Sequence, residues 1–323
     1  MDQNPDNKRF YHLPVMLEEC MEGLNIRPDG IYVDVTFGGG GHSRAILERL
    51  GDEGRLYAFD RDGDALDNGI DDPRFCLINE NFKHLKSFLR LNGVRRIDGL
   101  LADLGVSSHQ IDDGGRGFST RMDGPLDLRM DRREGTTAAD LVNSADEAEL
   151  ERLLRLYGEL PNARQMARAI VKWRTVEAES GKRKAESGEA GGIRTTGDLK
   201  AAVEHLLPRG RENKTLAMLF QALRIEVNGE LDALRSMLEQ AVELLNDGGR
   251  LCVMSYHSLE DRLVKNFFRT GNFEGELEKD FFGNPQVNLR VVTRKPVTAS
   301  DEELQRNNRS RSAKLRVAEK IEN

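Results

Sequence analysis

A strand that leads directly into a glycine cluster and then a helix constrains this chain more than any other feature. Residues 31–35 (IYVDV) predict a buried strand, four consecutive glycines occupy positions 38–41, and residues 45–50 (AILERL) predict the helix that follows. Glycine has no Cβ and tolerates positive φ, so such a turn lets the backbone approach a ligand closely. This arrangement is typical of the first unit of a ligand-binding α/β fold.

Further short apolar runs repeat the pattern. Strands are predicted over 55–59, 75–78, 97–102 and 248–255, with helical segments between them. Asp60 directly follows the second of the five strands, and Asp103 directly follows the fourth. Strands that alternate with helices favour a doubly wound parallel sheet with helices on both faces. Two late segments, 287–293 and 312–317, could close the sheet as an antiparallel hairpin.

The alternation stops between residues 112 and 215, where apolar residues recur at helical spacing. Helices are predicted there over 145–157, 163–176 and 196–207, and residues 177–192, which lack apolar periodicity, are expected to be a flexible insertion. We therefore expect an α/β domain formed by 1–111 and 216–323, with an inserted all-helical domain over 112–215.

In a doubly wound sheet, ligands bind beyond the carboxyl ends of the strands, where the strand order reverses. Asp60 lies 20 residues after Gly40, a spacing at which a carboxylate accepts the ribose hydroxyls of an adenosine. The third glycine of the GxGxxG pattern for NAD is replaced by Ser43 or Arg44, depending on the register. S-adenosylmethionine lacks a pyrophosphate, and Asp34 would suit its cationic end. Both cofactors stay open on this evidence, with NAD the poorer fit.

Composition narrows the class of protein. The chain has 48 basic and 55 acidic residues, a net charge of −7, which excludes a globally basic nucleic-acid binder. An RNA partner would have to meet a local basic face, such as residues 290–316. The sequence shows neither an N-terminal signal peptide nor an apolar run of about 20 residues, so we expect a cytoplasmic protein with no membrane partner. The three cysteines show no metal-ligand spacing.

Several longer motifs together resemble the bacterial RsmH family, also called MraW. They run in order from about residue 12 to about residue 318 and include DVTFGGGGHS (34–43), FDRD (59–62), LADLGVSS (101–108), MDGPLDLRMD (122–131), FQALRIEVN (220–228) and SYHSLEDR (255–262). The resemblance implies a Rossmann-like class I methyltransferase that uses S-adenosylmethionine. It also implies that the substrate is the exocyclic N4 amine of a decoding-region cytidine in 16S rRNA of the small ribosomal subunit. The helical insertion would recognise that substrate, and no DNA partner is expected.

By the same resemblance, cofactor contacts carry over to individual positions of this chain. These are Gly40, Gly41, His42, Asp60, Phe82, Asp103 and Gln110. The chain departs from the family pattern at His109, at Leu160, at 214–219 and at Asn308, which are mainly positions expected to hold RNA.

Two residues are candidates for catalysis. Asp103 directly follows the fourth strand and would orient the exocyclic amine of the cytidine. In the alternative, it binds only the cofactor. His257 follows the fifth strand, where a structural histidine is at least as common as a catalytic one. Phe118, Tyr256 and His257 are candidates to stack on a base that has left its helix. The histidines lack ligand spacing, so no metal site is predicted.

Two other functions are compatible with parts of the pattern. An NAD-dependent oxidoreductase would share the glycine loop, but it conflicts with the residues at 43 and 44. A non-enzymatic RNA-binding assembly factor would share the fold, but it would have no need for the intact loop and Asp60.

Overall fold

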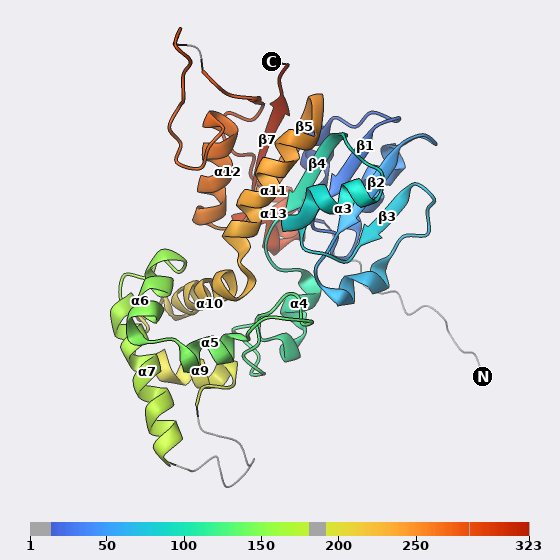
Figure 1. Ribbon diagram of the computed structural model, residues 1–323. Coiled ribbons are helices and arrows are strands. Elements are labelled where there is room, and N and C mark those ends of the chain that lie inside the picture. The colour runs from blue at the N-terminus through green and yellow to red at the C-terminus, as the bar shows by residue number, and fades with distance from the viewer. Residues whose placement is uncertain (1–13, 181–191, 284, 323) are drawn as a thin grey trace, which may run out of the picture. The chain divides into compact units, whose positions relative to one another are not determined.

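The computed structural model describes residues 14–180, 192–283 and 285–322. It divides the chain into two compact units (Figure 1). The first consists of the described residues within Met1–Gly105 and Leu231–Asn323, and the second is Val106–Glu230. The polypeptide therefore leaves the first unit after its fourth strand and returns to it 125 residues later, as expected for an insertion.

The first unit is built on a seven-stranded sheet in the order β3-β2-β1-β4-β5-β7-β6. Its strands are β1 (Ile31–Asp34), β2 (Arg55–Phe59), β3 (Phe75–Ile78), β4 (Ile97–Asp103), β5 (Leu245–Ser255), β6 (Leu289–Val291) and β7 (Lys314–Lys320). The pairs from β3 to β5 are parallel, whereas β7 pairs antiparallel with both β5 and β6. The strand order reverses between β1 and β4, which confirms the doubly wound fold and sets the ligand edge beside their carboxyl ends.

Helices cover both faces of this sheet because its central strands are apolar on both sides. On one face, α1 (Leu17–Leu24) and α2 (Gly41–Arg49) share a buried cluster with strand residues such as Leu101 and Met254. On the other face, α3 (Leu85–Leu91) lies beside α11 (Glu230–Leu244), and Gln240 of α11 accepts a hydrogen bond from the Lys86 amide (Figure 1). Beyond β5 come α12 (Ser258–Thr270) and α13 (Asp301–Arg306).

The second unit is helical and has its own core. Its helices are α4 (Ser108–Asp112), α5 (Ala138–Ser144), α6 (Glu147–Leu156), α7 (Ala163–Ser180), α9 (Thr196–Val203) and α10 (Glu212–Asn228). Leu150, Ile170, Leu199 and Leu223, each from a different helix, lie in one fully buried cluster. Side-chain caps define the starts of α5 and α9, where Thr137 and Thr195 each form a reciprocal capping box with an aspartate.

Two expected boundaries differ from the structure. The second unit runs from Val106 to Glu230 rather than from 112 to 215, because α10 buries Leu219, Phe220 and Leu223 in the helical core. Helix α7 continues to Ser180, so the expected flexible insertion does not begin at residue 177. The rest of that insertion, up to 191, lies outside the described residues. Within the described part of the chain, no helix is both long enough and apolar enough to cross a membrane.

Candidate active site

The glycine loop joins β1 to α2 and is fastened to the end of β2. The Gly38 amide donates to Oδ2 of Asp60 at 2.8 Å, and Asn68 donates to the Gly38 carbonyl at 3.0 Å. Gly40 caps α2 with a φ of 75°, a left-handed conformation that strains any residue with a Cβ. The loop is therefore held open beside a carboxylate by backbone contacts that only glycine makes without strain.

Replacing Gly40 by alanine should deform this loop. A Cβ at position 40 would lie 2.9 Å from the Phe37 ring, and the positive φ adds a backbone cost of about 1 kcal/mol. We expect cofactor affinity, measured by calorimetry, to fall about 10-fold, which corresponds to about 1.4 kcal/mol. Gly63→Ala is the matched control because its Cβ would meet nothing within 4 Å and its φ is not positive. Equal affinities in the two variants would contradict this role for Gly40.

Asp60 sits directly after β2 and accepts two backbone hydrogen bonds, from Gly38 to Oδ2 and from Asp62 to Oδ1 at 2.9 Å. A carboxylate offers about four lone-pair sites, so two acceptor positions remain for a ligand. Burial raises the pKa of Asp60 to about 6, even though both backbone amides favour the charged form. At neutral pH the group is thus a fixed, partly desolvated anion at the ligand edge of the sheet.

Asp34 has a different role from the one its position suggests. Only 1% of its surface is exposed, and its oxygens accept hydrogen bonds from the Thr36 amide, the Thr36 hydroxyl and the Ser43 hydroxyl. The expectation that Asp34 faces the cationic end of a cofactor is therefore wrong. Its carboxylate instead ties the end of β1 to the first turn of α2.

Asp103, at the end of β4, belongs to a small polar cluster. Its amide donates to the Thr36 hydroxyl at 2.7 Å, and Oδ1 accepts the Tyr256 hydroxyl, also at 2.7 Å. Oδ2 lies 4.0 Å from Nδ1 of His42. The other ring nitrogen of His42, Nε2, is 3.0 Å from the Val15 carbonyl, which can only accept, so Nε2 carries the hydrogen.

In neutral His42, Nδ1 is then an acceptor that faces the Asp103 carboxylate. A donor group placed between these two atoms would satisfy both. Burial raises the pKa of Asp103 to about 6, and the Tyr256 hydrogen bond opposes that rise. The structure thus brings Asp103 close to His42, and the roles of both residues in cofactor binding stay predictions. It also adds Thr36, which the sequence reasoning missed, and gives the Tyr256 hydroxyl a polar partner.

These two carboxyl groups predict how stability depends on pH. Each has a pKa of about 6 when folded, against 3.8 ordinarily, so the folded protein binds the proton more tightly. Their contribution to stability is complete below about pH 4 and is lost as the pH rises through 6. In cofactor-free wild-type protein, the free energy of unfolding should therefore fall between pH 5 and pH 7.5. We expect this fall to be about 1 kcal/mol smaller in Asp103→Asn. Urea titrations at both pH values measure this, and an unchanged difference would contradict it.

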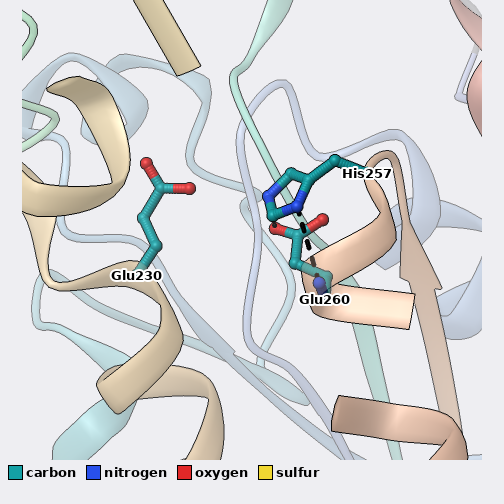
Figure 2. A group of neighbouring side chains, drawn as sticks. All are labelled: Glu230, His257 and Glu260. Carbon is teal, nitrogen blue, oxygen red and sulfur yellow. Dashed lines mark hydrogen bonds and ion pairs between the residues drawn. The ribbon is translucent and has the colours of Figure 1, made fainter. Parts of the chain in front are cut away.

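His257 lies at the start of α12, next to Glu260 (Figure 2). Its Nδ1 faces the Glu260 amide at 3.5 Å, and its Nε2 lies 3.2 Å from Oε1 of Glu260. Both side chains are more than nine-tenths buried, and Oε2 of Glu260 accepts the Tyr256 amide. This geometry gives His257 a helix-capping role, and its catalytic role stays a prediction. Glu230, also drawn in Figure 2, belongs to the second unit, where it forms an ion pair with Arg224.

The remaining predicted residues lie in different places. Phe82 begins η2 (Phe82–His84), four residues after β3, and is partly exposed at the same edge of the sheet as Asp60. Gln110 is buried in the second unit, where it forms a capping box with Ser107 at the start of α4. Phe118 packs against the helical core of that unit. The roles of Phe82 and Gln110 in cofactor binding and of Phe118 in stacking stay predictions.

Many of the arginines that flank the insertion serve the fold. Arg116 is fully buried and donates to the carbonyls of Arg129 and Met130, while Arg129 binds Asp127. In the basic tail, Arg290 pairs with Glu319, and both Lys314 and Arg316 pair with Asp261. Part of the positive charge that the sequence offers for RNA is therefore neutralised internally.

The ligand edge of the first unit fits an adenosine cofactor. Asp60 provides free acceptor positions beside an open glycine loop, and Phe82 offers an aromatic face at the end of the neighbouring strand. Asp103 adds a carboxylate at the end of β4, and the His42 ring faces it from the start of α2. A sulfonium cofactor that also carries an amino group needs acceptors and anions of this kind, whereas the α2 N-terminus lacks the third glycine expected for a dinucleotide.

The chain is similar to proteins of one family over nearly its whole length. Residues 9–321 match the MraW methylase family. "Ribosomal RNA small subunit methyltransferase H" of Bacteroides thetaiotaomicron is 54% identical over 310 residues, which cover 96% of this chain and 97% of that protein. The protein of the same name from Parabacteroides distasonis is 54% identical, and the match covers 96% of this chain and 98% of that protein. The protein of that name from Flavobacterium psychrophilum is 53% identical, and the match covers 94% of this chain and 100% of that protein.

Proposed function

Because this chain belongs to the MraW methylase family, we propose that it methylates the N4 amine of a decoding-region cytidine in 16S rRNA within the small ribosomal subunit. The chain is a methyltransferase acting on ribosomal RNA, and its methyl donor is S-adenosylmethionine. The observation that carries the finer proposal is the near-complete match to relatives named for the small subunit, combined with an acceptor-rich site in the first unit. Its place of action would be the cytoplasm.

S-adenosylmethionine supplies an activated methyl group, so the protein mainly has to bind and orient the two reactants. Asp60 would hold the ribose hydroxyls, and Gly40 and Gly41 would let the backbone come close to the cofactor. Phe82 would cover the adenine ring. The ends of the paired strands position these residues. The cofactor contacts therefore do not depend on bound substrate.

The acceptor amine is a poor nucleophile and has to be activated, because the lone pair on the exocyclic nitrogen of cytosine is delocalised into the ring. A carboxylate that accepts an N–H of this amine would localise the lone pair on nitrogen. Asp103 is suited to this role, since Tyr256 and the Thr36 hydroxyl fix its side chain and backbone while Oδ2 is left without a hydrogen bond among the described residues. The amine loses one proton when its nitrogen gains the methyl group, and a carboxylate with a pKa of about 6 can accept it.

The proposal is tested in cells. Nucleosides from 16S rRNA of a strain that lacks this protein should contain less N4-methylated cytidine than those of the parent strain, as measured by mass spectrometry. The level should return on complementation with the wild-type protein. An unchanged level in the deletion strain would reject the proposed substrate position.

A further inference from the structure

One face of α7 carries three exposed cations that contribute little to holding the fold together. Arg164, Arg168 and Lys172 stand at positions i, i+4 and i+8, so they form one row along the helix. All three are exposed, while Ala163, Met166, Ala167 and Ile170 form the buried face. Residues 160–176 contain four basic residues and no acidic one. The fourth, Arg174, donates to the carbonyls of Val142 and Ala145 and has a structural role.

The row lies in a groove rather than on a flat surface. The groove is lined by Arg164, Gln165, Arg168 and Lys172 of α7 and by His205 and Leu206 of η4 (Glu204–Leu206). Asn162, just before α7, donates to the Leu206 carbonyl at 3.2 Å and so fastens η4 to the start of the helix. Both walls belong to the second unit, and both present hydrogen-bond donors.

The positive charge of the groove is largely uncompensated. Arg168 lies 3.4 Å from Glu147, but both side chains are exposed and such a pair is weak and easily exchanged. Among the described residues, neither Arg164 nor Lys172 has an ion-pair partner. Arg164 also stands in the first turn of α7, which contains no acidic residue, although the helix dipole disfavours cations there. An anion in the groove would remove this unfavourable arrangement.

We propose that the α7–η4 groove binds phosphates of the ribosomal RNA substrate. This inference rests on the function proposed above and places one RNA contact on the inserted unit. A row of cations with one helical turn between neighbours can follow a sugar-phosphate strand, and such contacts add affinity without reading sequence. Contacts of this kind hold the RNA in place rather than recognise the cytidine.

The sole tryptophan of the chain provides a local reporter. Trp173 follows Lys172 on α7 and is partly exposed. Binding of 16S rRNA in the groove should change its fluorescence. The same titration, repeated at several salt concentrations by filter binding, gives the dissociation constant and its salt dependence.

The test compares the full-length wild-type protein with a variant carrying Arg164→Gln, Arg168→Gln and Lys172→Gln. The RNA is 16S rRNA from a strain lacking the enzyme. We expect the variant to bind it about 10-fold or more weakly at 100 mM salt, with a slope of log affinity against log salt that is smaller by about 2. The matched control removes three exposed arginines of the first unit, Arg90→Gln, Arg95→Gln and Arg269→Gln. It should change the affinity by less than about 3-fold.

The outcomes separate the two proposals. If the wild-type protein binds S-adenosylmethionine but not this RNA at any salt concentration, the proposed substrate is wrong and the groove inference falls with it. If the wild-type protein binds the RNA and the α7 variant matches the control, only the groove inference is overturned. S-adenosylmethionine affinity should be equal in all three proteins, which shows that the variants are folded.

Discussion

Asp60→Asn should abolish measurable binding of S-adenosylmethionine, with an expected loss of at least 100-fold in affinity. Asparagine keeps the size of the side chain but replaces one acceptor oxygen with an NH₂ group. That group would face either the Gly38 or the Asp62 amide, which now donate to the two carboxylate oxygens at 2.8 and 2.9 Å. Loss of charged hydrogen bonds to the ribose costs about 1.5–3 kcal/mol each, and displacement of the glycine loop adds to it.

Isothermal calorimetry measures this loss, and Asp71→Asn is the matched control. Asp71 is an exposed carboxylate eleven residues further along the chain, and its replacement changes the net charge equally. The control should bind the cofactor with wild-type affinity. Asp60→Asn should not reduce the unfolding temperature of cofactor-free protein greatly, because removing a buried charge offsets the lost hydrogen bond. Wild-type affinity in Asp60→Asn would show that the cofactor is held elsewhere.

Asp103→Asn should leave cofactor affinity within a few-fold of wild type but lower the turnover number by about 100-fold or more. Asparagine can still accept the Tyr256 hydroxyl on its oxygen, so the local structure is preserved. It cannot take a proton from the amine. Single-turnover measurements with a labelled methyl group separate this effect from binding. If Asp103→Asn instead weakens the cofactor and leaves turnover intact, Asp103 binds only the cofactor, which was the second possibility that the sequence left open.

The pH profile of turnover gives an independent readout of the same group. Protonation of Asp103 should produce an acidic limb near pH 6 in the wild-type protein. Tyr256→Phe removes a hydrogen bond that favours the charged carboxylate, so the limb should move to higher pH. A limb that stays in place in Tyr256→Phe would mean that another group controls the rate.

Much of the first unit could be predicted because local signals and tertiary structure agree there. The strands before Asp60 and Asp103 were predicted within one residue at their carboxyl ends, and parallel pairing then fixes both carboxylates at one edge. The predictions failed where burial rather than position determines the role of a side chain. Asp34 stands in the glycine motif, but its carboxylate accepts hydrogen bonds from Thr36 and Ser43. No sequence pattern distinguishes a carboxylate that is buried in this way from one that faces a ligand.

Other features depend on contacts that sequence periodicity does not reveal. The boundary of the helical unit moved to Glu230 because α10 packs into the helical core, yet its apolar pattern is equally consistent with either unit. The Tyr256 hydroxyl donates a hydrogen bond to Asp103, which lies 153 positions earlier in the sequence. The sequence analysis did not single out the cation row on α7, because only the adjacent η4 segment shows that these cations line a groove.

The central claim is tested most directly by reconstituting the reaction with purified protein. Small subunits and 16S rRNA from a strain lacking the enzyme are incubated with S-adenosylmethionine whose methyl group carries deuterium, and the decoding-region fragment is isolated and digested to nucleosides. We expect mass spectrometry to find the deuterated methyl group on N4 of one cytidine, and we expect Asp103→Asn to transfer little of it. A label on another nucleoside or in another region of the RNA, or no transfer to either substrate, would contradict the account.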